Sequence, residues 1–142
     1  MILKELSIIN YRNLKETELN FSHKLNCIVG KNGMGKTNIL DAIYYLSFCK
    51  SSINPLDSQN IHHDSDFSIL KGKYTSDLGS DEIIFCGLKR KKKKSFKRNG
   101  KEYNKLSNHI GFIPLVMISP SDSDLISGGS DERRKFLDQV IS

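Results

Sequence analysis

The stretch Gly30-Lys31-Asn32-Gly33-Met34-Gly35-Lys36-Thr37 decides the fold, because it holds the complete pattern of a phosphate-binding loop, with Gly-Lys-Thr starting five residues after the first glycine. Such a loop binds phosphate through successive backbone N–H groups that point into one concavity. Glycines keep the concavity open, since they tolerate positive φ and let phosphate oxygens approach the backbone. The pattern predicts that residues 30–37 bind a nucleotide.

Two side chains of this loop add charge and metal chemistry. Lys36 is expected to reach the β- and γ-phosphates as a point charge, and the Thr37 hydroxyl is expected to ligate Mg²⁺. The helix that starts here directs the positive end of its dipole at the phosphates. Hydrolysis also needs a carboxylate at the end of a second buried strand, and no apolar run ending in Asp or Glu follows the loop. The chain is therefore expected to hold no catalytic residue.

The segments next to the loop have the periodicity that a P-loop requires. Residues 25–29 form a short apolar run that predicts a buried strand, and apolar residues at helical spacing predict a helix from Lys36 to about Cys49. A chance glycine-rich turn is the alternative, but it would not need a strand before it and a helix after it. Ahead of them, residues 2–11 and 14–21 alternate as in a β-hairpin.

The rest of the chain predicts further strands. Residues 50–66 lack periodicity and are expected to be an exposed connection. Strands are expected at 67–74 and 82–89, and Asn99-Gly100 predicts a type I′ hairpin turn, which together suggest a second, smaller antiparallel sheet. Another buried strand is expected at 113–118.

The last residues predict two helices. Ser121-Asp122-Ser123-Asp124 would cap a short helix that ends at Gly128-Gly129, and Ser130 would cap a final one with acidic residues in its first turn. The apolar spacing of this final helix continues to the last residues without a C-cap. We therefore expect a truncated chain.

Residues 30–43 resemble the Walker A segment of the DNA-repair ATPases of the RecF and SMC group, which are related to ABC transporters. In that group an aromatic-Arg-Asn element lies on a hairpin before the motif, here Tyr11-Arg12-Asn13. The closing segment resembles the RecF family in particular, with Ser119-Pro120 followed by Gly128-Gly129-Ser130-Asp131-Glu132-Arg133-Arg134-Lys135-Phe136-Leu137-Asp138. Ser130 stands where the family usually has proline.

The resemblance implies an α/β fold: the N-terminal part of an ABC-type ATPase head lobe over residues 1–142, with a mixed sheet, a P-loop helix and a smaller antiparallel sheet. It implies ATP and Mg²⁺ as cofactors, DNA binding, an ATP-dependent homodimer and weak DNA-dependent ATPase activity. It also implies recombinase loading at gaps, SOS induction and recombination mediator proteins as partners. The family's Walker B aspartate, signature motif and helical arm would lie beyond residue 142.

The sequence allows two interpretations for each of several polar side chains in or near these motifs. Arg12 resembles the hairpin arginine that approaches the nucleotide phosphates in related ATPases, but an ordinary surface arginine at a turn is the alternative. Asn32 either lines the loop near the γ-phosphate or is there for its tolerance of positive φ. Arg133 and Arg134 face about 100° apart on a helix, so salt bridges to neighbouring acids compete with contacts to DNA or a partner.

The charge of the chain is concentrated in one segment. Lys and Arg exceed Asp and Glu by 22 to 16, and residues 89–98 hold eight cations in ten residues. We expect nonspecific contact with the DNA backbone from this basic run, through Lys91, Lys92, Lys93, Lys94, Lys97 and Arg98. The alternative is a solvated strand edge whose lysines prevent edge-to-edge aggregation.

Other features limit the function class. The three cysteines lack metal-ligand spacing and are expected to be reduced thiols, and the histidines give no metal site beyond the nucleotide-bound Mg²⁺. No stretch approaches the roughly 18 apolar residues of a membrane span, so a cytoplasmic protein is expected.

Three rival functions stay open. An SMC-type chromosome-organising ATPase would require long heptad repeats after the front lobe. A P-loop kinase for a small metabolite would need a closing lid and acceptor-binding residues. A nonenzymatic nucleic-acid-binding module would keep only a vestigial P-loop.

Overall fold

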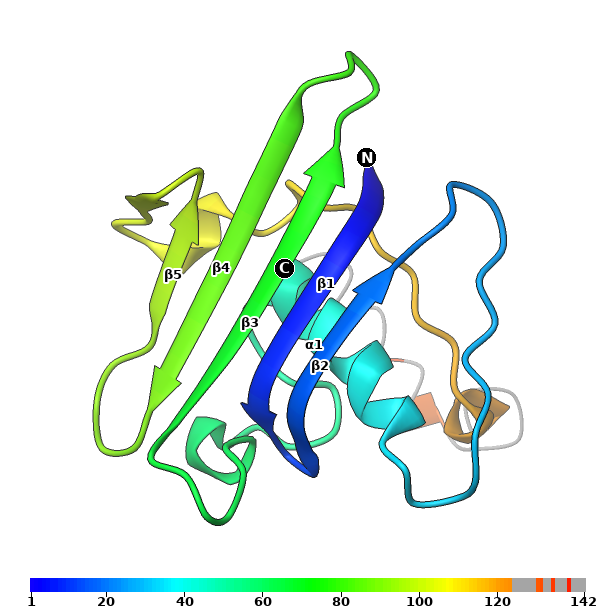
Figure 1. Ribbon diagram of the computed structural model, residues 1–142, viewed down its shortest axis with the longest axis vertical. Helices are drawn as coiled ribbons and strands as arrows, with labels where there is room; N and C mark the ends of the chain where they lie inside the picture. The colour runs from blue at the N-terminus through cyan, green and yellow to red at the C-terminus, as the bar shows by residue number, and fades with distance from the viewer. Residues whose placement is uncertain (124–129, 132–133, 135–137, 139–142) are drawn as a thin grey trace.

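The computed structural model describes residues 1–123 together with residues 130, 131, 134 and 138. In this part of the chain, six strands form one sheet and one α-helix packs across a face of it (Figure 1). The strands are β1 (Ile2–Tyr11), β2 (Leu14–Asn20), β3 (Phe67–Thr75), β4 (Asp81–Lys89), β5 (Ser95–Arg98) and β6 (Lys101–Glu102). The helices are α1 (Lys36–Phe48) and the short 3₁₀ turns η1 (Asp57–Gln59), η2 (Leu106–Asn108) and η3 (Pro120–Ser123).

The sheet is a single antiparallel sheet with the order β2-β1-β3-β4-β5-β6. The expectation of a mixed sheet with a separate smaller one is therefore wrong for the described residues. The reason is that β3 pairs along β1, with Ile8 opposite Leu70, so the later strands extend the first hairpin. Sequence periodicity alone does not say which strand lies beside which.

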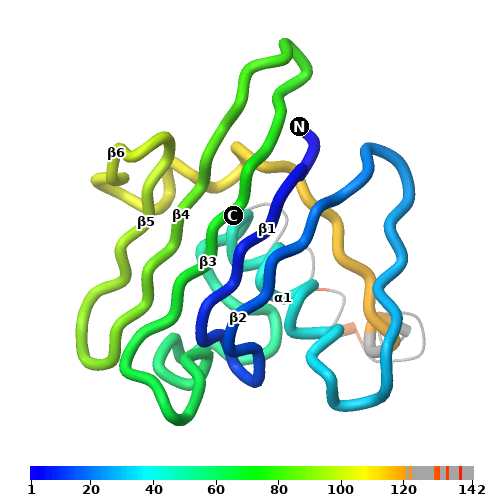
Figure 2. Tube along the Cα trace, viewed as in Figure 1, coloured from blue at the N-terminus to red at the C-terminus, as the bar shows by residue number. Residues whose placement is uncertain are grey.

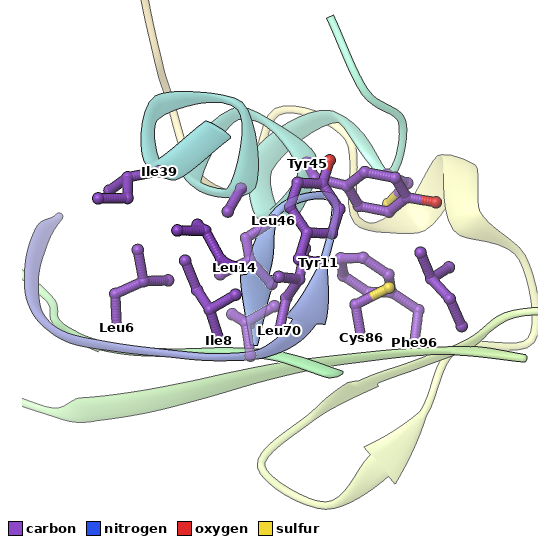
Figure 3. Close-up of a cluster of buried hydrophobic side chains, with 14 of the residues drawn as sticks. Leu6, Ile8, Tyr11, Leu14, Ile39, Tyr45, Leu46, Leu70, Cys86 and Phe96 are labelled. Carbon is purple, nitrogen blue, oxygen red and sulfur yellow. The ribbon is translucent and has the colours of Figure 1, made fainter. Parts of the chain in front are cut away.

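The core lies between the sheet and α1. Ile8, Leu70, Cys86 and Phe96 are successive cross-strand neighbours and form one buried row across four strands. The helix covers this row with its buried face, which carries Ile39, Ala42, Tyr45 and Leu46 (Figure 3). Alternation in the strands and helical spacing in α1 thus bury complementary apolar surfaces.

The helix and the hairpin turn form as the sequence predicts. The helix ends at Phe48, and Cys49 takes the left-handed conformation with φ 56° while its N–H donates to the Tyr45 carbonyl at 2.9 Å. Asn99 and Gly100 both have positive φ, 50° and 81°, as a type I′ turn between β5 and β6 requires.

Two expected strands do not form in the described structure. Residues 25–29 and 113–118 have no strand partner there, and several of their apolar side chains are exposed, among them Val29 at 87% and Val116 at 86%, although Ile113 is buried in the core. Both segments are apolar as strands often are, but a strand exists only where a second strand satisfies its backbone hydrogen bonds.

The final helix falls largely outside the described residues. Residues 130, 131, 134 and 138 have helical backbone, whereas Gly128-Gly129 and Arg133 are not described. The cysteines are free, with Cys49 and Cys86 buried and Cys27 exposed, and burial raises the pKa of the Cys49 thiol to about 11. Among the described residues, no helix is long and apolar enough to cross a membrane.

We expect Leu70→Ala to destabilise the fold, because it opens a cavity in the middle of the buried row. The predicted loss is about 2–5 kcal/mol of unfolding free energy, seen as a lower thermal unfolding midpoint of the full-length gene product. The matched control is Leu78→Ala, whose side chain is 97% exposed in the β3–β4 turn. Equal midpoints for the two variants would contradict the assignment of the core.

Candidate nucleotide site and basic surface

The predicted phosphate-binding loop runs directly into the first turn of α1. Three of its residues have positive φ, Gly30 at 156°, Gly33 at 80° and Gly35 at 96°. The loop borders a cavity of about 390 Å³ lined by Asn13, Asn32, Gly33, Gly35, Lys36, Thr37 and Asn38. A concavity at the N-terminus of a 13-residue helix, with Lys36 and the exposed Thr37 on its wall, suits a nucleotide phosphate with Mg²⁺.

Lys36 holds the loop together from within. Its Nζ atom donates to the carbonyl oxygens of Gly30 at 2.7 Å and Lys31 at 2.8 Å. A lysine bonded to two neutral carbonyls can exchange those partners for phosphate oxygens, which are stronger acceptors.

The β1–β2 hairpin supports the loop from outside, at the same end of the sheet (Figure 2). Gly35 lies so close to it that a Cβ atom there would be 2.6 Å from Leu14 Cδ2 and 2.8 Å from Asn13 Oδ1. A glycine is therefore needed at position 35 for two reasons: the backbone has positive φ there, and a Cβ atom would overlap the side chain of Leu14.

Arg12 lies at the end of the β1–β2 hairpin and does not line the cavity beside the phosphate-binding loop. Its Nη1 atom lies 3.9 Å from the buried Asp41 Oδ2 and donates to Asn60 Oδ1 at 3.4 Å. The backbone of Arg12 has φ 53°, and its N–H donates to the Asn60 carbonyl at 2.9 Å. The structure thus places Arg12 next to the P-loop helix, beside the carboxylate of Asp41.

The segment of residues 50–66 is expected from its sequence to be an exposed connection, and that expectation is wrong for its centre. Asn60, Ile61 and His62 are buried, and Ile61 forms a bridge with Tyr11. His62 also donates its N–H to the Asn10 carbonyl at 2.8 Å. The polar composition suggests that the segment is exposed to solvent. Its backbone groups instead form hydrogen bonds with the backbone of the hairpin turn, and no local sequence signal indicates this pairing.

The basic run separates into partnered and exposed cations. Lys94 closes the C-terminal end of α1, where its Nζ donates to the Cys49 carbonyl at 2.7 Å and lies 3.0 Å from Asp57 Oδ2. Arg98 makes a two-pronged ion pair with Glu82, and these hydrogen bonds lower the pKa of the Glu82 carboxyl. Lys97 lies 5.8 Å from the ring centre of Phe85.

Lys91, Lys92 and Lys93 are exposed in the turn between β4 and β5, and Lys89, the last residue of β4, is exposed as well. Beside them lies a groove of about 570 Å³, lined by Lys93, Lys94, Phe96, Glu102, Tyr103, Asn104, Lys105 and Leu106. The preceding Arg90 anchors the turn, since its side chain donates to the carbonyls of Ser65 and His62 at 3.0 and 3.3 Å.

Two further groups of charged residues lie outside the nucleotide site. The ligand atoms of His62, His63 and Asp64 lie within 4.8 Å of one another, a cluster that the sequence spacing does not single out. The two imidazole planes are 25° apart and stacked, so their in-plane lone pairs run side by side and do not converge on one ion. Arg134 lies 3.6 Å from Asp131, an ion pair of the kind that the first of the two interpretations of this region describes.

Comparison with known proteins agrees with this geometry. The AAA ATPase domain family matches residues 1–114, so the chain belongs to that family of P-loop ATPases. It is 65% identical over 142 residues to the DNA replication and repair protein RecF of Phocaeicola vulgatus and 66% identical to RecF of Bacteroides fragilis. The expected resemblance to the RecF family is confirmed, and the chain spans 38% of the length of these two relatives.

Solved structures agree with the fold. The structure described as the recombination mediator protein RecF-ATP in the RecFOR pathway is 34% identical, with a TM-score of 0.88 over 96% of this chain and 37% of its own. An SMC ATPase structure is 19% identical, with a TM-score of 0.81 over 99% of each chain, a likeness of fold alone. The predicted fold class, an ABC-type P-loop head lobe, is confirmed.

Gly35→Ala should destabilise the protein more than Gly79→Ala. Both glycines have positive φ, so each substitution costs about 1–2 kcal/mol in backbone strain. Only at Gly35 does the added methyl meet Leu14 and Asn13, which adds about 1–3 kcal/mol of overpacking, whereas the Gly79 site is open. Thermal unfolding of the two full-length variants measures the difference, and equal midpoints would argue against the tight packing at Gly35.

Proposed function

We propose that the protein is an ATP-binding protein of DNA replication and repair, of the RecF type. The observation that carries this proposal is the phosphate-binding loop of residues 30–37 at the N-terminus of α1, in a chain that is 65% identical over its whole length to a RecF protein. Residues 1–142 would form the N-terminal part of its ATPase head.

Different groups of the loop are proposed to bind the phosphates and the Mg²⁺ of the nucleotide. The backbone N–H groups of residues 30–37 would bind the phosphates, and Lys36 would exchange its two carbonyl partners for phosphate oxygens. The Thr37 hydroxyl, exposed on the first turn of α1, would ligate Mg²⁺, which would supply positive charge to the phosphates. Arg12, which the RecF resemblance assigns to the phosphates, stays a proposed nucleotide contact. Its guanidinium lies 3.9 Å from Asp41 Oδ2 and outside the cavity of the loop, so it would have to turn away from Asp41 to reach a phosphate.

DNA contact is assigned to the turn between β4 and β5. Lys91, Lys92 and Lys93 are exposed and consecutive, and the adjoining groove carries Lys105. Such a surface binds the phosphate backbone without reading sequence. Lys94 is held at the end of α1, and Arg98 is paired with Glu82 at the end of β4 and β5 away from this turn, so neither would carry the binding.

The finer parts of the proposal come from the RecF resemblance. They are an ATP-dependent homodimer, weak DNA-dependent ATPase activity, recombinase loading at gaps with recombination mediator proteins, and SOS induction. Action on chromosomal DNA would place the protein in the cytoplasm. An SMC-type function is the second candidate, because an SMC ATPase shares the fold across 99% of both chains. The RecF function is preferred, since identity is 65% to RecF and 19% to that SMC protein.

Lys36→Ala in the full-length gene product should weaken ATP binding by at least about tenfold, because the variant has no charged donor for the phosphate oxygens. Isothermal titration with Mg-ATP measures the effect. The matched control is Lys50→Ala, which removes an exposed lysine just beyond the other end of α1 and should leave the affinity unchanged. Unaltered ATP binding by Lys36→Ala would leave the vestigial-loop alternative standing.

Replacing Lys91, Lys92 and Lys93 together by Gln should weaken DNA binding and flatten its salt dependence. The slope of log affinity against log salt should fall by about 0.9 for each duplex phosphate that the turn no longer neutralises, or by about 0.7 on a single strand. Fluorescence anisotropy with labelled DNA at several salt concentrations measures this slope.

A second triple variant controls for net charge. Lys15, Lys24 and Lys71 are also exposed but lie on other parts of the molecule, so changing them to Gln removes the same charge elsewhere. If both triple variants lower the slope equally, the β4–β5 turn is not the DNA-binding surface.

A Lys94→Gln variant should instead lower the unfolding midpoint, because it removes the ion pair and hydrogen bond at the end of α1.

A further inference from the structure

Asn13 contacts the phosphate-binding loop from outside the motif. Its Nδ2 atom donates to the Gly33 carbonyl at 2.7 Å, and its Oδ1 atom accepts from Asn38 Nδ2 at 2.6 Å. A carbonyl oxygen can only accept, so the Gly33 contact fixes which end of the Asn13 amide faces the loop. One side chain therefore bridges the middle of the loop and the first turn of α1.

The position of Asn13 is set by the hairpin that carries it. The neighbouring Tyr11 is buried and donates its hydroxyl to Asp41 Oδ2 at 2.7 Å, and the Arg12 N–H donates to the Asn60 carbonyl at 2.9 Å. Leu14, on the other side, packs against Gly35. Asn13 thus comes from a turn held on both sides, although its own side chain is exposed.

The contact with Gly33 determines the direction of a peptide plane in the loop. In a trans peptide the Gly33 carbonyl and the Met34 N–H point in opposite directions. With the carbonyl held by Asn13, the Met34 N–H points the other way and donates to the Lys31 carbonyl at 3.4 Å, an oxygen that also accepts from Lys36 Nζ at 2.8 Å. The inner side of a P-loop is the side on which N–H groups receive phosphate.

We propose that Asn13 is a positioning residue of the nucleotide site, which holds the Gly33 peptide so that the loop N–H groups face the phosphates. The cavity of the site includes Asn13 and Asn38 on its wall, together with Lys36 and Thr37. The inference rests on the proposed ATP binding at residues 30–37 and adds a residue that the loop motif does not contain.

Asn13→Ala in the full-length gene product tests the proposal. Losing one neutral hydrogen bond that orders the loop should raise the Kd for Mg-ATP by about twofold to tenfold, with the thermal unfolding midpoint unchanged. Hydrogen exchange of a peptide covering residues 30–37, measured without nucleotide, should become faster. Asn13→Gln, which keeps an amide donor, should restore part of the affinity.

The matched control is Asn20→Ala, which shortens another exposed asparagine at the far end of β2 and should bind ATP like the wild type. Wild-type affinity and exchange in Asn13→Ala would overturn the inference while ATP binding itself stands. A lower unfolding midpoint with no change in loop exchange would also overturn it, in favour of a purely structural role. A wild-type protein that binds no ATP would instead defeat the proposed function.

Discussion

The buried carboxylate of Asp41 is the interaction on which the arrangement of the site depends. It accepts hydrogen bonds from the Tyr11 hydroxyl, the Ser51 hydroxyl, and both the N–H and the hydroxyl of Ser52, each at 2.7 Å. A buried charge is costly unless it is fully hydrogen-bonded, so these donors must stay in place for the chain to fold. They tie the P-loop helix to the end of β1 and to the segment that follows the helix. Burial, reinforced by this carboxylate, raises the pKa of Tyr11 and keeps its hydroxyl a donor.

From this centre the contacts lead outward to both candidate binding surfaces. The turn after Tyr11 presents Arg12 toward Asp41 and Asn13 toward the phosphate-binding loop. The same turn is bonded to residues 60–62, and the His62 carbonyl accepts from Arg90, which precedes the exposed lysines. The nucleotide loop and the lysine turn thus share a support, in which backbone hydrogen bonds join the hairpin turn to residues 60–62 and the side chains of Asn13 and Arg90 extend it to the two surfaces.

The basic run shows how tertiary contacts divide residues that look alike in sequence. Lys94 binds at the C-terminal end of α1, because the last carbonyl groups of a helix lack hydrogen-bond donors and the carboxylate of Asp57 lies beside them. Arg98 is paired with Glu82 across two neighbouring strands and stacks 3.8 Å from the ring centre of Phe112. The side chains that stay exposed to solvent are those of Lys91, Lys92 and Lys93 in the turn and of Lys89 at the end of β4. A charge count of the run therefore overstates the cations available to DNA.

The sequence by itself determined the features that depend on near neighbours: the loop of residues 30–37, the helix that follows it, and the Asn99-Gly100 turn, each set by backbone preferences within a few residues. The tertiary structure decided which strands pair, that Asn60 and His62 are buried, that Lys94 is structural, and that Asn13 supports the loop. Those outcomes depend on groups far apart in the chain, such as Asn13 and Gly33 or Lys94 and Cys49. Periodicity and composition describe each segment alone, whereas a hydrogen bond between distant segments exists only once packing has brought them together.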